Sequence, residues 1–323
     1  MSGGGKFMKG IMVDNWFMEE VIADIREQNI HNSRCYSDLL MALVLWDEVY
    51  YPLNNYNWWN SVDSQVQNVL LPLDDSDEKG KMESLKKLYY NYKYRGLSED
   101  DIYWLKWKNN NMVESDDIVG TGAIRYLELS KRNELDYLPC EKRQNFLREY
   151  LSKNNMKFTF QSMCSRLNLQ DEVTKEIERY FEEGFQGMID FSEFPIEMPV
   201  LANFIIGNAT DGMSPIDFAL YLKNEKSVIR YRKYLDEIDY NFRKQKWREV
   251  KYLLKCSHDA IESVISMDKQ RVMTTSVNIF PVIGIELQMT GNILETIKKF
   301  KNNYRFAFLK HIVEYGITNR HLR

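Results

Sequence analysis

The chain has 323 residues and a formal net charge of −4, with 44% hydrophobic and 28% charged residues. This balance is typical of a soluble globular protein with about two domains. It argues against a protein that coats nucleic acid through non-specific phosphate contacts, because such proteins are basic. Only 15 glycines and 7 prolines are present, fewer turn residues than an all-β fold needs. The composition therefore predicts a mainly α-helical, multi-helix globular protein.

Location follows from cysteine usage and from the apolar runs. The cysteines are few and widely spaced, which favours reduced thiols over a disulfide framework: Cys35, Cys140, Cys164 and Cys256. The longest apolar run, Leu39–Trp46, is too short to span a bilayer. We expect residues 1–8 to form a flexible tail and not a secretory leader. The sequence thus predicts a cytoplasmic protein with no membrane partner.

The first predicted domain covers residues 9–115. Apolar residues recur at helical spacing over Phe17–Glu27. A second helix begins near Ser37, and the chain stays apolar to Tyr51. This stretch is either one buried helix or a helix that passes into a strand at Val49–Tyr51, and Pro52 ends it.

The rest of this domain contains an aromatic segment and two more helices. Residues 54–60 are predicted to form a loop that carries Trp58 and Trp59. A helix is expected over residues 82–94. Ser98 and Asp101 match the Ser-x-x-acid capping box that starts a helix.

The middle segment, residues 116–197, is predicted to be helical and acidic at its end. Helices are expected over residues 118–130, beginning after Gly120-Thr121-Gly122, and over residues 141–153 and 169–183. Between residues 171 and 197 there are nine acids and two basic residues. Arg125 stands where a dinucleotide fingerprint needs its third glycine. We therefore expect no nucleotide cofactor.

The C-terminal domain, residues 198–323, gives the clearest helix signals. Ser214 is predicted to be an N-cap, followed by Pro215 at the first helical position and Asp217 in the first turn. An apolar seam follows at three- and four-residue spacing: Val228, Tyr231, Leu235, Ile238 and Phe242. A break near Gln245 separates it from a second helix with the same spacing, from Val250 to Val264.

The end of the chain mixes a small β element with helices. Residues 276–287 are rich in β-branched residues around Pro281, which predicts a strand or hairpin near residues 277–287. Helices are expected over residues 293–300 and 304–315, with Gly316 ending the last one.

A basic face and an aromatic loop are the candidate partner-binding surfaces. Between residues 221 and 255 there are eleven Lys or Arg and five acids. Several of these fall opposite the apolar seam: Lys226, Arg230, Lys233, Lys244 and Arg248. The favoured interpretation is a solvated outer face, and the alternative is a docking surface for an acidic partner. The aromatic loop with Trp58 and Trp59 is likewise either packed in the core or a docking patch.

Catalytic and metal motifs are weak. The histidines are His31, His258, His311 and His321, and no C-x-x-C or H-E-x-x-H motif is present. His31 lies four residues from Cys35 and His258 two from Cys256, so a composite metal site is conceivable. Solvated histidines and buried thiols explain these residues more simply, so no metal site is predicted. Glu286 and Gln288 lie in an apolar stretch that precedes a predicted helix, and this arrangement resembles the restriction-endonuclease-like core. In that core a carboxylate binds the metal and a residue two positions on assists the attacking water. A divergent metal-dependent nuclease is therefore the alternative hypothesis for function.

A second resemblance covers residues 198–240. The pattern from Pro215 to Leu220, followed by Val228 to Leu235, resembles a segment of poorly characterised bacterial proteins. Some of those proteins are associated with phage-defence or mobile loci. The lack of a clear catalytic motif, the oppositely charged segments and the aromatic loop lead us to expect a non-enzymatic protein-interaction or sensing subunit, and the resemblance points to a bacterial phage-defence or toxin-type system. Its expected partner is another protein or a second copy of the chain, and nucleic acid is not favoured.

Overall fold

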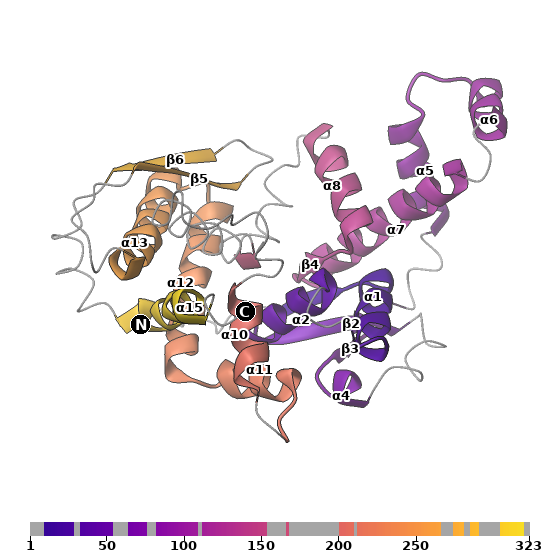
Figure 1. Ribbon diagram of the computed structural model, residues 1–323. Coiled ribbons are helices and arrows are strands. Elements are labelled where there is room, and N and C mark those ends of the chain that lie inside the picture. The colour runs from indigo at the N-terminus through magenta and orange to yellow at the C-terminus, as the bar shows by residue number, and fades with distance from the viewer. Residues whose placement is uncertain are drawn as a thin grey trace, which may run out of the picture. The chain divides into compact units, whose positions relative to one another are not determined.

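The computed structural model divides the chain into two compact units, coloured along the chain in Figure 1. It describes residues 10–28, 33–53, 64–75, 82–108, 112–153, 166–167, 200–209, 212–265, 274–280, 285–290 and 304–319. Unit 1 comprises residues 1–23 and 48–163, and unit 2 comprises residues 24–47 and 164–323. Unlike the three consecutive segments predicted from the sequence, each unit combines an early and a later stretch of the chain. Of the described residues 75% are helical, which confirms the mainly α-helical fold.

Unit 1 is built on a four-stranded parallel sheet of order β3-β2-β1-β4. The strands are β1 (Gly10–Val13), β2 (Glu48–Pro52), β3 (Leu71–Leu73) and β4 (Asp136–Leu138). All four residues of β1 are buried, as expected for an inner parallel strand covered on both faces. Of these strands only β2 was anticipated, as the helix-then-strand alternative, and Pro52 is its last residue.

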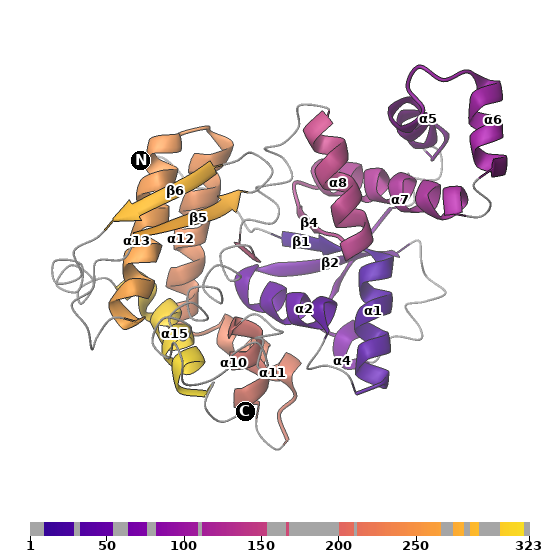
Figure 2. The same cartoon turned by 45° about the horizontal axis from the view of Figure 1, so that its top comes forward.

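Helices cover both faces of this sheet. The described helices of unit 1 are α1 (Asn15–Arg26), α4 (Ser64–Gln67), α5 (Met82–Lys93), α6 (Glu99–Lys108), α7 (Met112–Arg132) and α8 (Glu141–Lys153). Helices α1 and α4 lie on one face, and α7 and α8 lie on the other (Figures 1 and 2). This arrangement fits the strand order, because the chain adds β2 and β3 on one side of β1 and then crosses back from β3 to β4 on the other side. An aromatic cluster joins α5, α7 and α8, in which Tyr89 packs against Phe146 with ring centroids 5.8 Å apart.

Local sequence signals in unit 1 were mostly sufficient to place helix ends. The predicted capping box at α6 is present: Asp101 N–H donates to Ser98 Oγ at 3.2 Å, and Ser98 N–H donates to the Asp101 carboxylate at 3.1 Å. The predicted start of α7 after Gly120-Thr121-Gly122 was wrong. The helix begins at Met112, and the two glycines lie inside it.

Unit 2 is a bundle of helices with a two-stranded antiparallel hairpin. Its elements are α2 (Arg34–Leu45), α10 (Val200–Asn208), α11 (Pro215–Lys223), α12 (Lys226–Arg243), α13 (Trp247–Ile265), β5 (Thr274–Phe280), β6 (Ile285–Thr290), a short 3-10 helix η4 (Tyr304–Phe306) and α15 (Ala307–Asn319). The hairpin confirms the predicted β element, and it lies beside α12 and α13 (Figure 2). Gly316 was expected to end the last helix but lies within α15.

The predicted helix pair of unit 2 is present in detail. Ser214 caps α11 with a full capping box to Asp217, and Pro215 occupies the first helical position. Gln245 has a φ of 54° between α12 and α13, at the predicted break. The seam residues from Val228 to Ile238 are buried, as are Val250 and the apolar residues that follow it at helical spacing.

Residue 166, outside every predicted element, carries a buried positive charge in unit 2. The Arg166 side chain contacts the carboxylates of Asp236 and Asp239 and lies over the Trp46 ring, with 5.2 Å between its Cζ and the ring centroid. Asp236 and Asp239 are three residues apart on α12 and therefore lie on the same face of this helix. This ion cluster fixes α12 to the chain around residue 166.

Candidate functional site

The candidate site lies where β1 and β4 end. From β1 the chain runs to β2 and β3 on one side of the sheet and later returns to β4 on the other side. In open α/β sheets, ligands bind at such a reversal point, outside the carboxyl ends of the strands. Asp14 follows β1 directly, and Pro139 and Cys140 lead from β4 into α8. The first turns of α1 and α8 therefore meet at this edge.

Asp14 is the centre of a buried polar network at this edge. Its side chain is fully buried. Oδ1 accepts a hydrogen bond from the Phe17 N–H at 2.9 Å and pairs with Arg143 Nη1 at 2.8 Å. Oδ2 accepts from the Tyr137 hydroxyl at 2.6 Å. Asp14 thus caps α1, neutralises a buried guanidinium and holds a tyrosine of β4.

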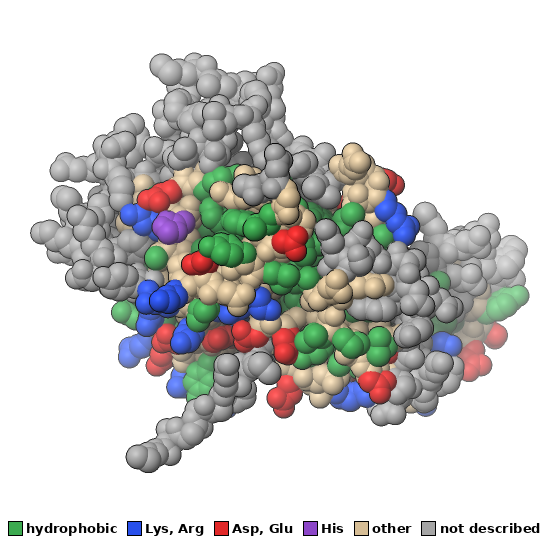
Figure 3. Space-filling model, turned by 90° about the horizontal axis from the view of Figure 1, so that it is seen from below, with side chains coloured by type: hydrophobic (Ala, Val, Ile, Leu, Met, Phe, Trp, Pro, Cys, Tyr) green, Lys and Arg blue, Asp and Glu red, His purple; other side chains and the backbone are tan. Residues whose placement is uncertain are grey.

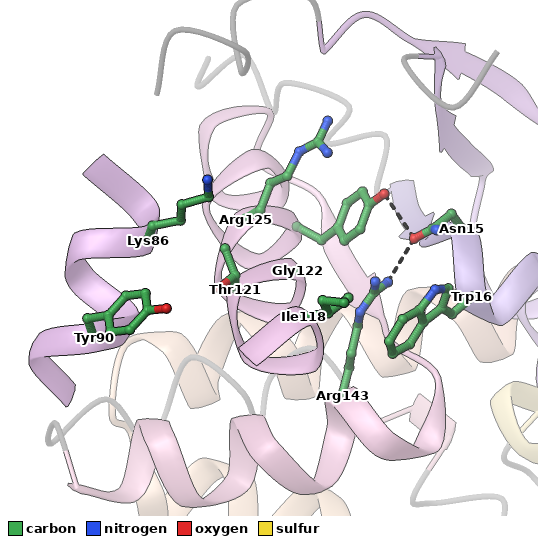
Figure 4. A pocket seen from close by; sticks show the side chains of 10 residues that line it. Asn15, Trp16, Lys86, Tyr90, Ile118, Thr121, Gly122, Arg125 and Arg143 are labelled. Carbon is green, nitrogen blue, oxygen red and sulfur yellow. Dashed lines mark hydrogen bonds between the residues drawn. The ribbon is translucent and has the colours of Figure 1, made fainter. Parts of the chain in front are cut away.

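Asn15 extends the network toward solvent. Its side-chain oxygen accepts hydrogen bonds from Arg143 Nη1 at 2.9 Å and from the Tyr126 hydroxyl at 3.0 Å, as the dashed lines in Figure 4 show. The Arg143 guanidinium also stacks over Trp16, with 4.3 Å between Cζ and the ring centroid. A stacked and multiply bonded guanidinium has little freedom to reorient. Arg143 is therefore held in place before any ligand arrives.

The acid–base groups of the network are held in one protonation state. Burial by itself lowers the pKa of Arg143, but the nearby Asp14 and Tyr137 raise it by more, so the guanidinium stays charged. Burial, and then the charge of Asp14, raises the pKa of Tyr137 well above its usual value. Burial likewise raises the pKa of the Cys140 thiol to about 12. At neutral pH neither Tyr137 nor Cys140 supplies a nucleophilic anion.

A second arginine is held in a similar way by a carboxylate that follows β3. Asp75 is 2% exposed, and its Oδ2 lies 2.8 Å from Arg125 Nη2. The Arg125 side chain keeps 17% of its surface exposed, so it can reach a ligand from α7. Carboxylates after β1 and β3 thus each anchor one arginine.

Both arginines, together with Asn15, Trp16 and Tyr126, line a pocket of about 400 Å³. Such a volume lies within the range of roughly 300–1,000 Å³ that is common for small-molecule sites. Lys86 of α5, Arg125 of α7 and Arg143 of α8 are its basic residues (Figure 4). The other residues that line it are polar or apolar: Asn15, Trp16, Tyr90, Ile118, Thr121, Gly122 and Tyr126. Among the described residues that line the pocket, none is acidic.

Two buried donors at this pocket have no acceptor. Among the described residues, nothing accepts a hydrogen bond from Arg125 Nε or from Arg143 Nε. The Arg143 side chain is only 4% exposed. An unsatisfied buried N–H raises the free energy of the folded state unless a ligand or a water molecule pairs with it. Both Nε atoms are shielded from solvent, so the capacity of the site for an anion lies in Lys86, which is exposed, and in the exposed part of Arg125.

The N-terminus of α1 is not part of that capacity. In many α/β proteins this position binds a phosphate through backbone N–H groups. Here the Asp14 carboxylate already accepts the Phe17 N–H. The anionic group of a ligand is therefore directed to the basic side chains on α5, α7 and α8.

The glycines of α7 make room for this arrangement. A Cβ at Gly122 would lie 2.8 Å from Arg143 Nη2, and one at Gly120 would lie 2.1 Å from the Tyr89 ring. Any larger residue would displace these groups. The Gly-Thr-Gly sequence therefore serves helix packing around the pocket.

The partner-binding residues predicted from the sequence lie elsewhere. Arg230 and Lys233 on α12, and Lys244 and Arg248 after it, are exposed as expected. On the face shown in Figure 3, basic and acidic side chains are interspersed and do not gather into areas of one sign. Trp58 and Trp59 lie outside the described residues. Whether any of these residues binds a partner stays a prediction.

The nuclease hypothesis also stays a prediction. Glu286 and Gln288 lie on β6, and Gln288 is in register with Ser276 of β5. The side chains of β6 are outside the described part of the structure. Within the residues that the structure describes, no three His, Cys, Asp or Glu side chains group as metal ligands.

Sequence reasoning did not find the pocket, although part of its signal was visible. A short apolar run, Gly10–Val13, is followed by a carboxylate and then by an amphipathic helix, which is typical of a first strand and its ligand edge. The pairing of Asp14 with Arg143 spans most of unit 1 in sequence and has no local signal.

The class of site is thus a cationic pocket with aromatic walls, at the ligand edge of a parallel α/β unit. No described helix is both long and apolar enough to cross a membrane. No family model, curated protein or solved structure matches the chain.

Proposed function

We propose that the chain is a non-enzymatic sensing subunit whose unit 1 binds a small anionic ligand. The observation that carries this proposal is the pocket itself, to which three helices contribute one basic side chain each. Anchored arginines are well suited to binding anions because their forks hold several donors in a fixed geometry.

The non-enzymatic part of the proposal rests on how the reactive groups are engaged. Asp14 accepts from a backbone N–H and from Tyr137 and pairs with Arg143. The Cys140 thiol is buried and has a pKa raised to about 12. Such groups organise a binding site, whereas a general base or nucleophile needs an accessible, deprotonated atom.

The anion-binding proposal can be tested by thermal denaturation of the full chain in low salt. A panel of inorganic phosphate, sugar phosphates, nucleotides and dicarboxylates serves as the ligands. A ligand present at 100 times its Kd stabilises the folded state by about 2.7 kcal/mol, which gives a measurable rise in Tm. We expect at least one anion to do so, with an effect that weakens as salt increases.

A charge reversal on α5 provides a matched control. Lys86 lines the pocket, and its neighbour Lys87 is exposed but does not line it. Lys86→Glu is expected to abolish the rise in Tm, and Lys87→Glu is expected to leave it. Equal effects of the two variants, or no response to any anion at millimolar concentration, would show that the pocket is not an anion receptor.

The sensing role also requires a partner protein, which we place within a bacterial phage-defence or toxin-type system. Support comes from the resemblance of residues 198–240 and from the exposed basic residues of unit 2. Replacing Arg230, Lys233, Lys244 and Arg248 with Glu should release a partner that co-purifies from the native host. A strictly monomeric protein with no co-purifying partner would contradict this part of the proposal.

A further inference from the structure

The pocket has two chemically different sides. Lys86, Thr121 and Arg125 lie together on one side, and Trp16 lies across from them with Ile118 between (Figure 4). An inorganic anion would need only the first side. The opposite side therefore indicates a ligand that has a body as well as a charged group.

The charged side fits a phosphate group. Lys86 and Arg125 come from different helices and can contact different oxygens of one group, and a phosphate presents three acceptor oxygens. The Thr121 hydroxyl adds a neutral donor beside them.

The opposite side fits a flat ring. The Arg143 guanidinium, which is 4% exposed, stacks on one face of Trp16 and holds the indole in place, and the half-buried Trp16 lines the pocket wall. Ile118, which is 59% exposed, offers an apolar contact beside it. Nucleobases stack on aromatic side chains and on guanidinium planes, and each stacked base contributes roughly 1–3 kcal/mol to binding.

From these two sides we infer that the ligand is a nucleoside monophosphate, with its phosphate at Lys86 and Arg125 and its base against Trp16 and Ile118. The inference rests on the proposed anion-binding function and names its ligand class. A nucleoside monophosphate also matches the volume of about 400 Å³ better than inorganic phosphate does. Recognition does not use a glycine-rich loop, because Gly120 and Gly122 pack against Tyr89 and Arg143.

The test is isothermal titration calorimetry of the full chain with the four common nucleoside monophosphates. Adenosine, ribose 5-phosphate and 4-hydroxybenzoate are the comparison ligands. At least one nucleotide should bind at least tenfold more tightly than either of its fragments, because only the intact nucleotide contacts both sides of the pocket.

Two variants assign the two sides separately. Lys86→Ala should weaken binding of the nucleotide and of ribose 5-phosphate by about tenfold, because a charge-assisted hydrogen bond is lost. Ile118→Ser should weaken binding of the nucleotide severalfold and leave ribose 5-phosphate unchanged. Lys87→Ala on α5 and Leu88→Ser, an exposed apolar residue of the same helix, are the controls and should change affinity less than about twofold.

The outcomes separate this inference from the proposed function. If 4-hydroxybenzoate binds in a Lys86-dependent way and no nucleotide does, the pocket is an anion receptor and the nucleotide assignment is wrong. If nucleotides bind to Lys86→Ala and to Ile118→Ser as tightly as they bind to the parent protein, they bind elsewhere and the inference fails. If no anion binds, the inference falls together with the proposed function.

Discussion

Replacing Asp14 with alanine should destabilise unit 1 strongly, because three partners lose their acceptor at once. Arg143 would remain as a buried charge that is 4% exposed, and the Tyr137 hydroxyl and the Phe17 N–H would both be left unpaired. Breaking a buried ion pair costs about 3–5 kcal/mol. The same carboxylate also caps α1, so the loss of the cap is part of the same change. We expect Asp14→Ala to lower the free energy of unfolding by about 4 kcal/mol, a large part of the roughly 5–15 kcal/mol that holds a domain folded.

Urea unfolding followed by far-UV circular dichroism measures this loss. With slopes of roughly 1–3 kcal/mol per molar urea, the midpoint should fall by about 1 M or more. Asp14→Asn keeps an acceptor oxygen without the charge and should lose less. Asp100→Ala, at an exposed acid of α6, is the control and should stay within about 0.5 kcal/mol of the parent.

A double variant tests the reasoning itself. Once Arg143 has also been replaced by methionine, the loss of Asp14 no longer leaves a buried charge unpaired. The double variant should therefore be more stable than the sum of the two single losses predicts, by about 2 kcal/mol. Strict additivity, or a midpoint for Asp14→Ala that is indistinguishable from the parent, would refute the network as described.

Further predictions concern packing, capping, pH and the alternative function. Gly122→Ala should lower the free energy of unfolding, measured in urea, by about 1–3 kcal/mol, because its Cβ would meet Arg143 at 2.8 Å. A gain of about 1 kcal/mol, as helix propensity alone predicts, would contradict the contact. Ser214→Ala should cost about 1 kcal/mol and speed amide exchange at Asp217, whereas Ser227→Ala should do neither. Burial raises the pKa of Tyr36 to about 12 and raises that of Tyr137 well above its usual value, so their stabilising contribution is complete below pH 10 and is lost as the pH rises above it. Stability should therefore fall by about 1.4 kcal/mol per pH unit for each such tyrosine, and Tyr36→Phe should remove one such contribution from the slope. Degradation of DNA or RNA with Mg²⁺ or Mn²⁺ that is abolished by Glu286→Ala would replace the sensing proposal with the nuclease hypothesis.

Helices and their ends could be predicted from the sequence because their signals are local. The capping boxes at Ser98 and Ser214, the seam from Val228 and the break at Gln245 each depend on residues within one or two turns. The parallel sheet had no comparable signal. Its strands β3 and β4 have three residues each, too few to show a period, and a parallel sheet is held by pairings between distant segments.

The candidate site was missed for the same reason. Asp14 and Arg143 are separated by most of unit 1, and Asp75 and Arg125 by 50 positions. Nothing near Arg143 in the sequence marks it as buried, because arginine at a helix start is usually solvated. Helix propensity disfavours glycine, so the sequence predicts a helix that starts after Gly122. In the structure both glycines lie inside α7, where close packing leaves no room for a Cβ.

Those two glycines have a consequence for how ligand length could be selected. Two positions apart on a helix face nearly opposite directions, so Gly120 sets the approach of α5 while Gly122 sets that of α8. Helix α5 carries Lys86 and α8 carries Arg143, so the packing of both helices on α7 sets the distance between these two basic side chains. A methyl group added at Gly120 would push Tyr89, and with it α5, away from α7, whereas one added at Gly122 would displace Arg143 itself. The size of the residue at position 120 therefore sets the distance between α5 and α7, and with it the length of anion that fits between their basic side chains.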